Sequence, residues 1–275
     1  MKIAAIIACY NRKEYTKRCL SSLIKQFYQT PELKFDIYVY DDGSIDGTSE
    51  MIRNIFPQVI LLQGRGNDYW CKSMHYLMKK ALEKKYDLYL MLNDDVDLNQ
   101  NALKVMLESY ECVGESCGIV GATVSALSGD CTYGGRNLEE KMMIPNGKLQ
   151  KCKLANWNCF LLDANVINRV GVIDGKFQHA WGDFDYSSRM NKKGIPIYLA
   201  TEYVGECEIN SAKGTYKDNE LCRYERLKKL CSHKGLPVYS FFRYNIKMEG
   251  IKGAFKALYG YASILGYILL NKKID

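Results

Sequence analysis

The sequence predicts an α/β protein in which helices flank a central, mostly parallel sheet. Apolar runs of strand length occur at residues 3–9, 36–40, 59–62 and 88–92, and each run ends abruptly in polar residues. Between these runs, apolar residues recur every three or four positions, as on one face of a helix. This alternation is typical of a parallel sheet with helices on both faces, in which ligands bind beyond the carboxyl ends of the strands.

Each of the first four predicted helices has one apolar face. The faces consist of Cys19, Leu20, Leu23, Ile24 and Phe27; Met51, Ile52, Ile55 and Phe56; Met74, Leu77, Met78, Ala81 and Leu82; and Ala102, Leu103, Met106, Leu107 and Tyr110. Further along, the pattern is less regular. We expect strands at residues 119–123, 131–134 and 195–199, a polar loop at 139–147 and a helix at 186–193.

The composition limits the kinds of partner that we expect and the cellular compartment in which we expect the protein. With 38 basic and 31 acidic residues, the chain has a net charge of +7, which suits nucleotides or an acidic membrane surface and gives little support for a nucleic-acid partner. The 11 cysteines include no CxxC pair, and Met1 and Lys2 lead directly into the first strand without a signal peptide. No apolar stretch has the length of a membrane-spanning helix. We therefore expect a cytoplasmic protein with reduced thiols.

The end of the fourth predicted strand carries a cluster of acidic residues. Side chains at alternate positions of an extended segment point the same way, so Asn93, Asp95 and Asp97 should line one side and Asp94 the other. Such oxygen ligands suit Mg²⁺ or Mn²⁺, which takes its remaining ligands from water and substrate phosphates. The alternative is a solvated turn that caps the helix after Asn99.

The second and third strands also end in polar turns. Asp41 is placed to accept a hydrogen bond from a base or ribose, whereas Asp42 and Ser44 more simply cap the next helix. Gly64 and Gly66 would let the backbone pass close to a ligand. Neither a GxGxxG loop nor a Walker motif is present, which argues against a dinucleotide site or a P-loop.

These motifs, in this order, resemble those of the inverting glycosyltransferases of family 2, which have the GT-A fold. The resemblance is carried by residues 8–12, 41–44, 64–70, 92–95, 158–162, 170–174 and 181–189. It implies a catalytic domain at residues 1–215, with a Rossmann-like nucleotide-sugar-binding half at 1–117 and an acceptor half at 118–215. A basic, amphipathic helical tail follows at residues 216–275. Within the family, the motifs look like those of the branch of bacterial surface-polysaccharide enzymes and rhamnosyltransferases.

The resemblance also implies a set of site residues. Donor binding would involve Ala8, Tyr10, Asn11, Arg12, Asp41, Gly66, Asn67, Trp70, Asn93 and Asp94. The Mn²⁺ or Mg²⁺ ion would be held by Asp95 and Asp97, and the acceptor by Trp181, Gly182 and Asp185. Asp183 takes the place of the general base, which a weakly nucleophilic acceptor hydroxyl requires. Without the resemblance, Asp183 would more simply cap the helix that follows it.

Two positions depart from the family pattern. Gly182 precedes the expected base where relatives often have Glu. Residues 205–208 stand where many relatives place a metal-binding His, so Glu206 or Cys207 could replace that ligand, or the diphosphate could fill the site. Trp157 and Trp181 are candidates for stacking on a sugar, although Trp157 could equally be a core residue.

The tail has a different character from the rest of the chain. Residues 221–231 form a basic helical segment that contains Arg223, Arg226, Lys228 and Lys229. Residues 250–273 carry lysines at both ends and an apolar helical face made of Ile251, Phe255, Leu258, Tyr259, Ala262, Leu265 and Leu269. Such a helix either lies in a membrane interface, as a peripheral contact with the inner face of the cell membrane, or packs on the catalytic domain or on a second copy in a homo-oligomer.

We therefore predict an enzyme, a hexosyl- or deoxyhexosyltransferase that moves a sugar from a nucleotide-diphosphate donor to a glycan or lipid-linked acceptor. Its place in capsule, O-antigen or cell-wall polysaccharide synthesis rests on the resemblance alone. Two alternatives are a catalytically silent nucleotide-sugar-binding scaffold and a sugar-phosphate nucleotidyltransferase. The latter should have a glycine-rich N-terminal loop with Arg and Lys, which residues 8–12 do not supply.

Overall fold

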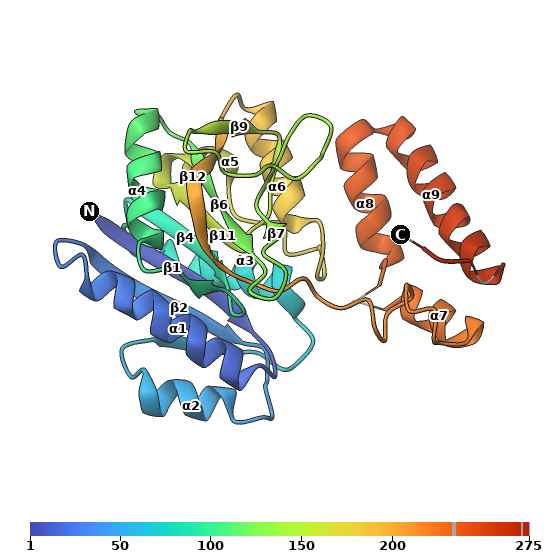
Figure 1. Ribbon diagram of the computed structural model, residues 1–275, viewed down its shortest axis with the longest axis horizontal. Coiled ribbons are helices and arrows are strands. Elements are labelled where there is room, and N and C mark those ends of the chain that lie inside the picture. Colours follow the sequence, from blue (N-terminus) through green and yellow to red (C-terminus); the bar gives the residue numbers. More distant parts are fainter. Residues whose placement is uncertain (233–234, 271, 275) are drawn as a thin grey trace.

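The computed structural model describes residues 1–232, 235–270 and 272–274 (Figure 1). A central sheet runs through the molecule with helices against both of its faces, and the last helices of the chain lie together at one side. The predicted α/β class with a mostly parallel sheet is confirmed.

The first half alternates strands and helices as predicted. Its strands are parallel and lie in the order β3-β2-β1-β4, because each helix carries the chain back to the edge where the previous strand began. The elements are β1 (Lys2–Cys9), α1 (Lys13–Tyr28), β2 (Lys34–Asp41), α2 (Thr48–Ile55), β3 (Ile60–Gln63), α3 (Tyr69–Ala81) and β4 (Leu88–Asn93).

The second half extends the same sheet in the order β4-β11-β6-β12-β5, with β11 antiparallel to both of its neighbours. The strand predicted at 195–199 is too short. Strand β12 continues to Glu206, and its end pairs with β5, the short strand that begins at Asp97 of the acidic cluster. The elements are β5 (Asp97–Leu98), α4 (Ala102–Val113), β6 (Gly118–Val124), β7 (Cys131–Tyr133), β8 (Gly135–Arg136), β9 (Gln150–Cys152), β10 (Leu154–Ala155), β11 (Cys159–Asp163), α5 (Ala164–Val170), α6 (Gly182–Lys192) and β12 (Ile197–Glu206).

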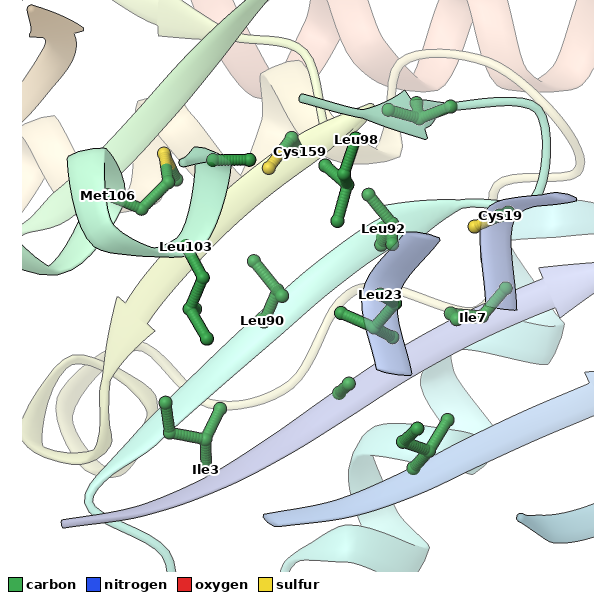
Figure 2. Packing of buried hydrophobic residues seen from close by; sticks show 14 of the residues in the cluster. Ile3, Ile7, Cys19, Leu23, Leu90, Leu92, Leu98, Leu103, Met106 and Cys159 are labelled. Carbon is green, nitrogen blue, oxygen red and sulfur yellow. The ribbon is translucent and has the colours of Figure 1, made fainter. Parts of the chain in front are cut away.

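Two apolar layers form the core, one on each face of the sheet. Alternate side chains of β1 divide between them: Ile3 and Ile7 pack with helices α1 and α4, whereas Ile6 packs with α3 and α6. Figure 2 shows the first layer, in which Leu23 of α1 and Leu103 of α4 lie over the strands. Strands buried on both faces are nearly continuous in apolar residues, which explains the uninterrupted runs in the sequence.

In the described part of the tail there are three helices: α7 (Arg223–Leu230), α8 (Val238–Glu249) and α9 (Ile251–Leu269). Helix α8 was not predicted, and the helix expected at 250–273 ends at Leu269; residue 271 lies outside the described residues. Arg226 does not belong to a solvated basic cluster, because its side chain is fully buried and donates hydrogen bonds to two backbone carbonyls. Figure 1 shows α8 between α9 and the sheet-containing part, where it contacts α6.

Candidate functional site

The carboxyl ends of the first four strands meet at one edge of the sheet, as predicted. In the parallel registers, Cys9 lies beside Asp41, Ala8 beside Asn93, and Asp41 beside Gln63. The polar turns that follow these strands therefore lie side by side. Ala8 itself is buried in the core, so only its backbone reaches this edge.

Arg12 joins the first turn to the acidic cluster. Its guanidinium donates to Asp95 at 2.5 Å and to Asp94 at 3.4 Å. Burial works against the charge of Arg12, but the two carboxylates raise its pKa above the ordinary value. Asp94 is buried beneath α1, where Thr16 also donates to it; burial is the main cause that raises the pKa of Asp94 to about 7.

The expected division of the acidic cluster into two sides is correct only in part: Asp95 and Asp97 line one pocket that Asp94 does not line, but Asn93 does not lie with them. Strand β4 ends at Asn93, so Asp94 and Asp95 lie in a turn and both reach Arg12. Asn93 faces the opposite way, and its side-chain oxygen accepts a hydrogen bond from the indole of Trp70 at 2.9 Å. The alternation of an extended segment does not apply beyond the strand's last residue.

The end of β12 completes this part of the edge. The Cys207 thiol donates to Asp95 at 3.6 Å, and burial, helped by Asp95, raises the pKa of that thiol to about 12. Asn210 in the following loop accepts a hydrogen bond from Arg12 at 3.4 Å. A pocket of 420 Å³ lies here, and its lining includes Arg12, Asp95, Asp97, Glu206, Cys207 and Glu208.

The chemistry of this pocket fits a hard divalent cation. Asp95 and Asp97 both line it and offer carboxylate oxygens, which Mg²⁺ and Mn²⁺ prefer. Among the described residues, no group of three His, Cys, Asp or Glu side chains is arranged to hold a metal ion. Asp95 and Asp97 are the expected protein ligands to such an ion, and Glu206 and Cys207, the alternatives from the sequence, line the same pocket beside Arg12.

Asp41, the last residue of β2, is buried. Its carboxylate accepts hydrogen bonds from the backbone N–H of Ser44 at 2.9 Å and from the hydroxyl of Ser49. Asn11, in the left-handed region with φ of 49°, ties the same turn to the first one: its N–H donates to Ser44, and its side-chain oxygen accepts from Ile45. The structure thus places Asp41 behind the edge, holding the turn in shape.

Asp42 organises the glycine-containing loop after β3 and does not cap α2. Its carboxylate accepts hydrogen bonds from the N–H groups of Gly66, Asp68 and Tyr69 at 3.0, 2.9 and 2.9 Å. A Cβ on Gly64 would lie 2.4 Å from Asp42 Oδ1, so the glycine is required by this packing, whatever the ligand. Around the loop, Tyr10 and Asn67 are exposed at the edge.

Asp183 lies in the first turn of α6. Its carboxylate accepts hydrogen bonds from the N–H of Phe184 at 2.9 Å and from the side-chain amide of Asn156 at 3.3 Å. Burial outweighs these bonds and raises the pKa of Asp183 to about 6. A carboxyl group with such a pKa is a competent base near neutral pH. It is not an N-cap residue, because α6 begins one residue earlier and Trp181 occupies the cap position.

A chain of contacts connects Asp183 to the acidic cluster. Trp157, next to Asn156 in the sequence, packs edge-to-face on Trp70 with ring centres 6.0 Å apart, and Trp70 bonds Asn93. Trp157 is 1% exposed, so it is a core residue and not a surface for sugar stacking. Asp183 and Asp41 are not among the residues that line the 420 Å³ pocket.

Two other residues expected on the acceptor side pack within the protein. Trp181 stacks on Tyr244 of α8, with ring centres 6.4 Å apart. Asp185 is 1% exposed, and its carboxylate is engaged by Arg189 at 3.0 Å and by Lys247 of α8 at 2.5 Å. The tail therefore docks on the helix that carries Asp183.

Close packing around position 182 explains why this residue is a glycine. A Cβ at this position would lie 2.6 Å from the sulfur of Cys71 and 3.1 Å from Ile173. Helix α6 therefore approaches the start of α3 more closely than any other residue type would permit. The Glu that relatives often have here would not fit this packing.

Two residues at the site were missed by the sequence analysis. Asn156 donates to Asp183, and its side-chain oxygen is buried and has no hydrogen-bond partner among the residues that the structure describes. Asn210 contacts Arg12. Both lie in irregular segments outside the motifs, so only the fold reveals them.

Comparisons with known proteins identify the family. A family model described as Glycosyl transferase family 2 matches residues 4–174. The chain is 28% identical over 100 residues to an uncharacterized glycosyltransferase of Mycoplasma genitalium, covering 35% of this chain and 33% of that protein. It is 30% identical over 114 residues to the poly-beta-1,6-N-acetyl-D-glucosamine synthase of Staphylococcus aureus, covering 40% and 25%. The matches thus span a third or less of these relatives.

Solved structures share the fold over nearly the whole chain. Staphylococcus aureus TarS in complex with UDP-GlcNAc has a TM-score of 0.59 and 14% identity, covering 98% of this chain and 88% of that one. A mannosyltransferase of Pyrobaculum calidifontis in complex with GDP-Man and Mn²⁺ has a TM-score of 0.58 and 12% identity, covering 98% and 73%. At these identities the likeness establishes the fold, which is that of GT-A glycosyltransferases.

Proposed function

We propose that this chain, which belongs to glycosyl transferase family 2, moves a sugar from a nucleotide-diphosphate sugar to a hydroxyl of a glycan or lipid-linked acceptor, with inversion at the anomeric carbon. The proposal is supported by two features that a chain of side-chain contacts connects: a pocket lined by Arg12 and carboxylates, and the half-buried Asp183, whose pKa is raised to about 6.

The donor would bind at the turns that follow β1 to β4. Arg12 offers a guanidinium to the diphosphate, a geometry suited to bidentate contacts with phosphate oxygens. Tyr10 and Asn67 are exposed at the same edge of the sheet, and Asn93 and Trp70 are joined there by a hydrogen bond. We assign Asp41 and Asp94 to holding these turns in place, because both carboxylates are buried and already bonded.

A divalent ion, when bound, would be held by Asp95 and Asp97 and would stabilise the negative charge on the departing diphosphate. Arg12 would contribute to the same end, because its guanidinium lines the pocket and carries a positive charge. Binding of phosphate oxygens would compete with Asp95 for that guanidinium.

Asp183 would act as the general base. As the acceptor oxygen forms its bond to the anomeric carbon, the bond to the diphosphate oxygen breaks and the hydroxyl proton passes to the Asp183 carboxylate. Asn156 holds one oxygen of that carboxylate, and the N–H of Phe184 holds the other, which fixes its direction. Because the carboxylate is poorly solvated, it is a stronger base than an exposed Asp.

Hexoses or deoxyhexoses are the proposed sugars, and synthesis of a surface polysaccharide is the proposed setting. The named relative that makes a poly-N-acetylglucosamine, and the neighbours solved with UDP-GlcNAc and GDP-Man, support this class of donor and product. Because lipid-linked acceptors reside in membranes, we place the enzyme in the cytoplasm at the inner face of the cell membrane.

The experiment is a screen of nucleotide sugars by thermal shift, with and without Mn²⁺, followed by assays of donor hydrolysis and transfer. We expect one nucleotide class to raise the melting temperature and to be turned over. Binding without turnover of any stabilising donor would favour a silent binding protein instead. No stabilisation by any nucleotide or nucleotide sugar would contradict the donor site.

A further inference from the structure

Helix α9 has one face that is packed against the rest of the tail. Gly253 allows close contact with α8, because a Cβ there would lie 1.9 Å from the backbone oxygen of Asn245. Ala257 and Ile268 are fully buried on the same side. Gly253 and Ala257 let the two helices approach closely, and Tyr261, Ile264, Leu265 and Ile268 pack in the apolar cluster of the tail, so α9 already has one packed face.

The opposite face of α9 is apolar and exposed along its whole length. Its residues follow helical spacing, and their exposed fractions are 80% for Ile251, 69% for Phe255, 58% for Leu258, 78% for Tyr259 and 56% for Leu269. At 1.5 Å per residue, the face extends for about 27 Å. These five residues, here named the α9 face, belong to the set for which the sequence left membrane and packing interpretations open. The structure leaves them uncovered.

Most of the charges around the α9 face are positive. The sequence from 250 to 274 contains no Asp or Glu, whereas Lys252, Lys256, Lys272 and Lys273 are exposed at its two ends. Lys256 has a partner, Glu249, at 2.8 Å, which lies just before the helix. An apolar stripe bordered by an excess of lysines is complementary to a surface that is apolar inside and anionic outside.

We propose that the α9 face docks on an anionic lipid bilayer, with the helix lying in the plane of the interface. Within the described ranges, no helix is long and apolar enough to cross a membrane, so α9 would lie on the bilayer and not span it. A symmetric dimer through the same face fits less well, because it would bring the lysines of two copies together without carboxylates from this segment to balance them.

Membrane docking by the α9 face is independent of the proposed transfer reaction, so an experiment can contradict one and support the other. It also gives the tail a defined orientation. Helix α8 contacts both α9 and α6, and Lys247 of α8 is bonded to Asp185, two residues after Asp183. A bilayer bound by α9 would therefore hold the helix of the proposed base at a fixed height above the membrane surface.

The test uses the full chain and sedimentation with vesicles of phosphatidylcholine, with or without phosphatidylglycerol. The double variant Phe255→Glu/Leu258→Glu should lower binding to the anionic vesicles by about tenfold or more, because two apolar anchors are lost. The variant Lys252→Glu/Lys273→Glu should lower binding to anionic vesicles and leave any weak binding to neutral vesicles unchanged. A matched control is Tyr28→Glu/Ile55→Glu, which alters exposed apolar residues of α1 and α2, far from α9 in Figure 1.

All substituted side chains are exposed, so melting temperatures should stay close to that of the wild type. The proposal is supported if the control binds anionic vesicles normally and the α9 variants do not. It is overturned if the wild type does not bind the vesicles, or if Phe255→Glu/Leu258→Glu binds as well as the control. Dimerisation that this variant abolishes, without vesicle binding by the wild type, would assign the face to a second copy.

Discussion

At Gly182, the absence of a side chain allows α6 to pack closely against the start of α3. A Cβ would lie 2.6 Å from the Cys71 sulfur, so Gly182→Ala should destabilise the fold by about 1–3 kcal/mol. Cys71→Ala removes the obstacle, and the double variant should therefore lose less stability than the sum of the two single variants. Chemical denaturation of the four proteins measures this coupling. Additive effects would show that the contact with Cys71 is not what excludes a side chain at Gly182.

Asp95 is the residue on which the proposed metal site depends most. Asp95→Asn removes the negative charge but can still accept a hydrogen bond from Arg12, so we expect little change in melting temperature. Stabilisation of the protein by a nucleotide sugar should lose its dependence on Mn²⁺, as followed by thermal shift. Asp130→Asn, in an exposed loop, is the control. If Mn²⁺ dependence persists in Asp95→Asn, Asp95 is not a ligand.

The sequence was most informative about residues directly after strands. Strand ends are fixed by buried apolar runs, so Arg12, Asp95 and Asn67 could be assigned to one sheet edge before the fold was known. The orientation of individual side chains could not be predicted. Asp41 is turned into its own loop by hydrogen bonds, and Asp42 reaches a loop 24 residues away, and neither preference is visible in local spacing.

At the scale of elements, the contact between α6 and α8 connects the tail to the proposed base. Asp185 is buried and would keep only Arg189 if Lys247 were removed. Lys247→Ala, which also removes the ion pair between Lys247 and Asp174, should therefore destabilise the protein by about 2 kcal/mol, a value below that for a fully buried pair because Lys247 is partly exposed. Lys256→Ala, which removes the exposed pair with Glu249, should cost less than about 0.5 kcal/mol. Urea denaturation distinguishes the two, and equal effects would contradict a structural role for the Asp185 pair.

Helices and strands were predicted correctly where the apolar periodicity is strong. They were missed or predicted too short where contacts between residues distant in sequence determine the structure. Helices α1 to α4 have clear apolar faces. Helix α8 was missed because its buried side is partly polar, with Ser240 and Asn245 among the buried residues. Strand β12 was predicted too short because its last residues, including Gly205, are held by pairing with β5 and β6, which are distant in sequence.

For the whole molecule, the raised pKa of Asp183 links acidity to both activity and stability. A base must be deprotonated, so transfer should increase as pH rises towards about 6 and level off above it. Stability should change in the opposite direction. Since the folded-state pKa is above that of the unfolded chain, the contribution of Asp183 is fully present below about 4 and is lost as pH rises through about 6.

The variant Asp183→Asn should remove this contribution to the pH dependence of stability, as measured by denaturation at pH values from about 4 to 8. Asp94, whose pKa is raised to about 7, changes stability in the same direction and remains in the variant as an internal reference. An unchanged pH dependence of stability in Asp183→Asn would mean that its carboxyl group is not strongly desolvated.

The most direct test of the whole account is sugar transfer by Asp183→Asn compared with the wild type, with the donor identified by the nucleotide-sugar screen. Because Asn keeps the size of Asp but cannot accept a proton, we expect normal donor affinity and a transfer rate lower by about a hundredfold or more. Transfer at near wild-type rate would remove Asp183 as the base and contradict the proposed mechanism.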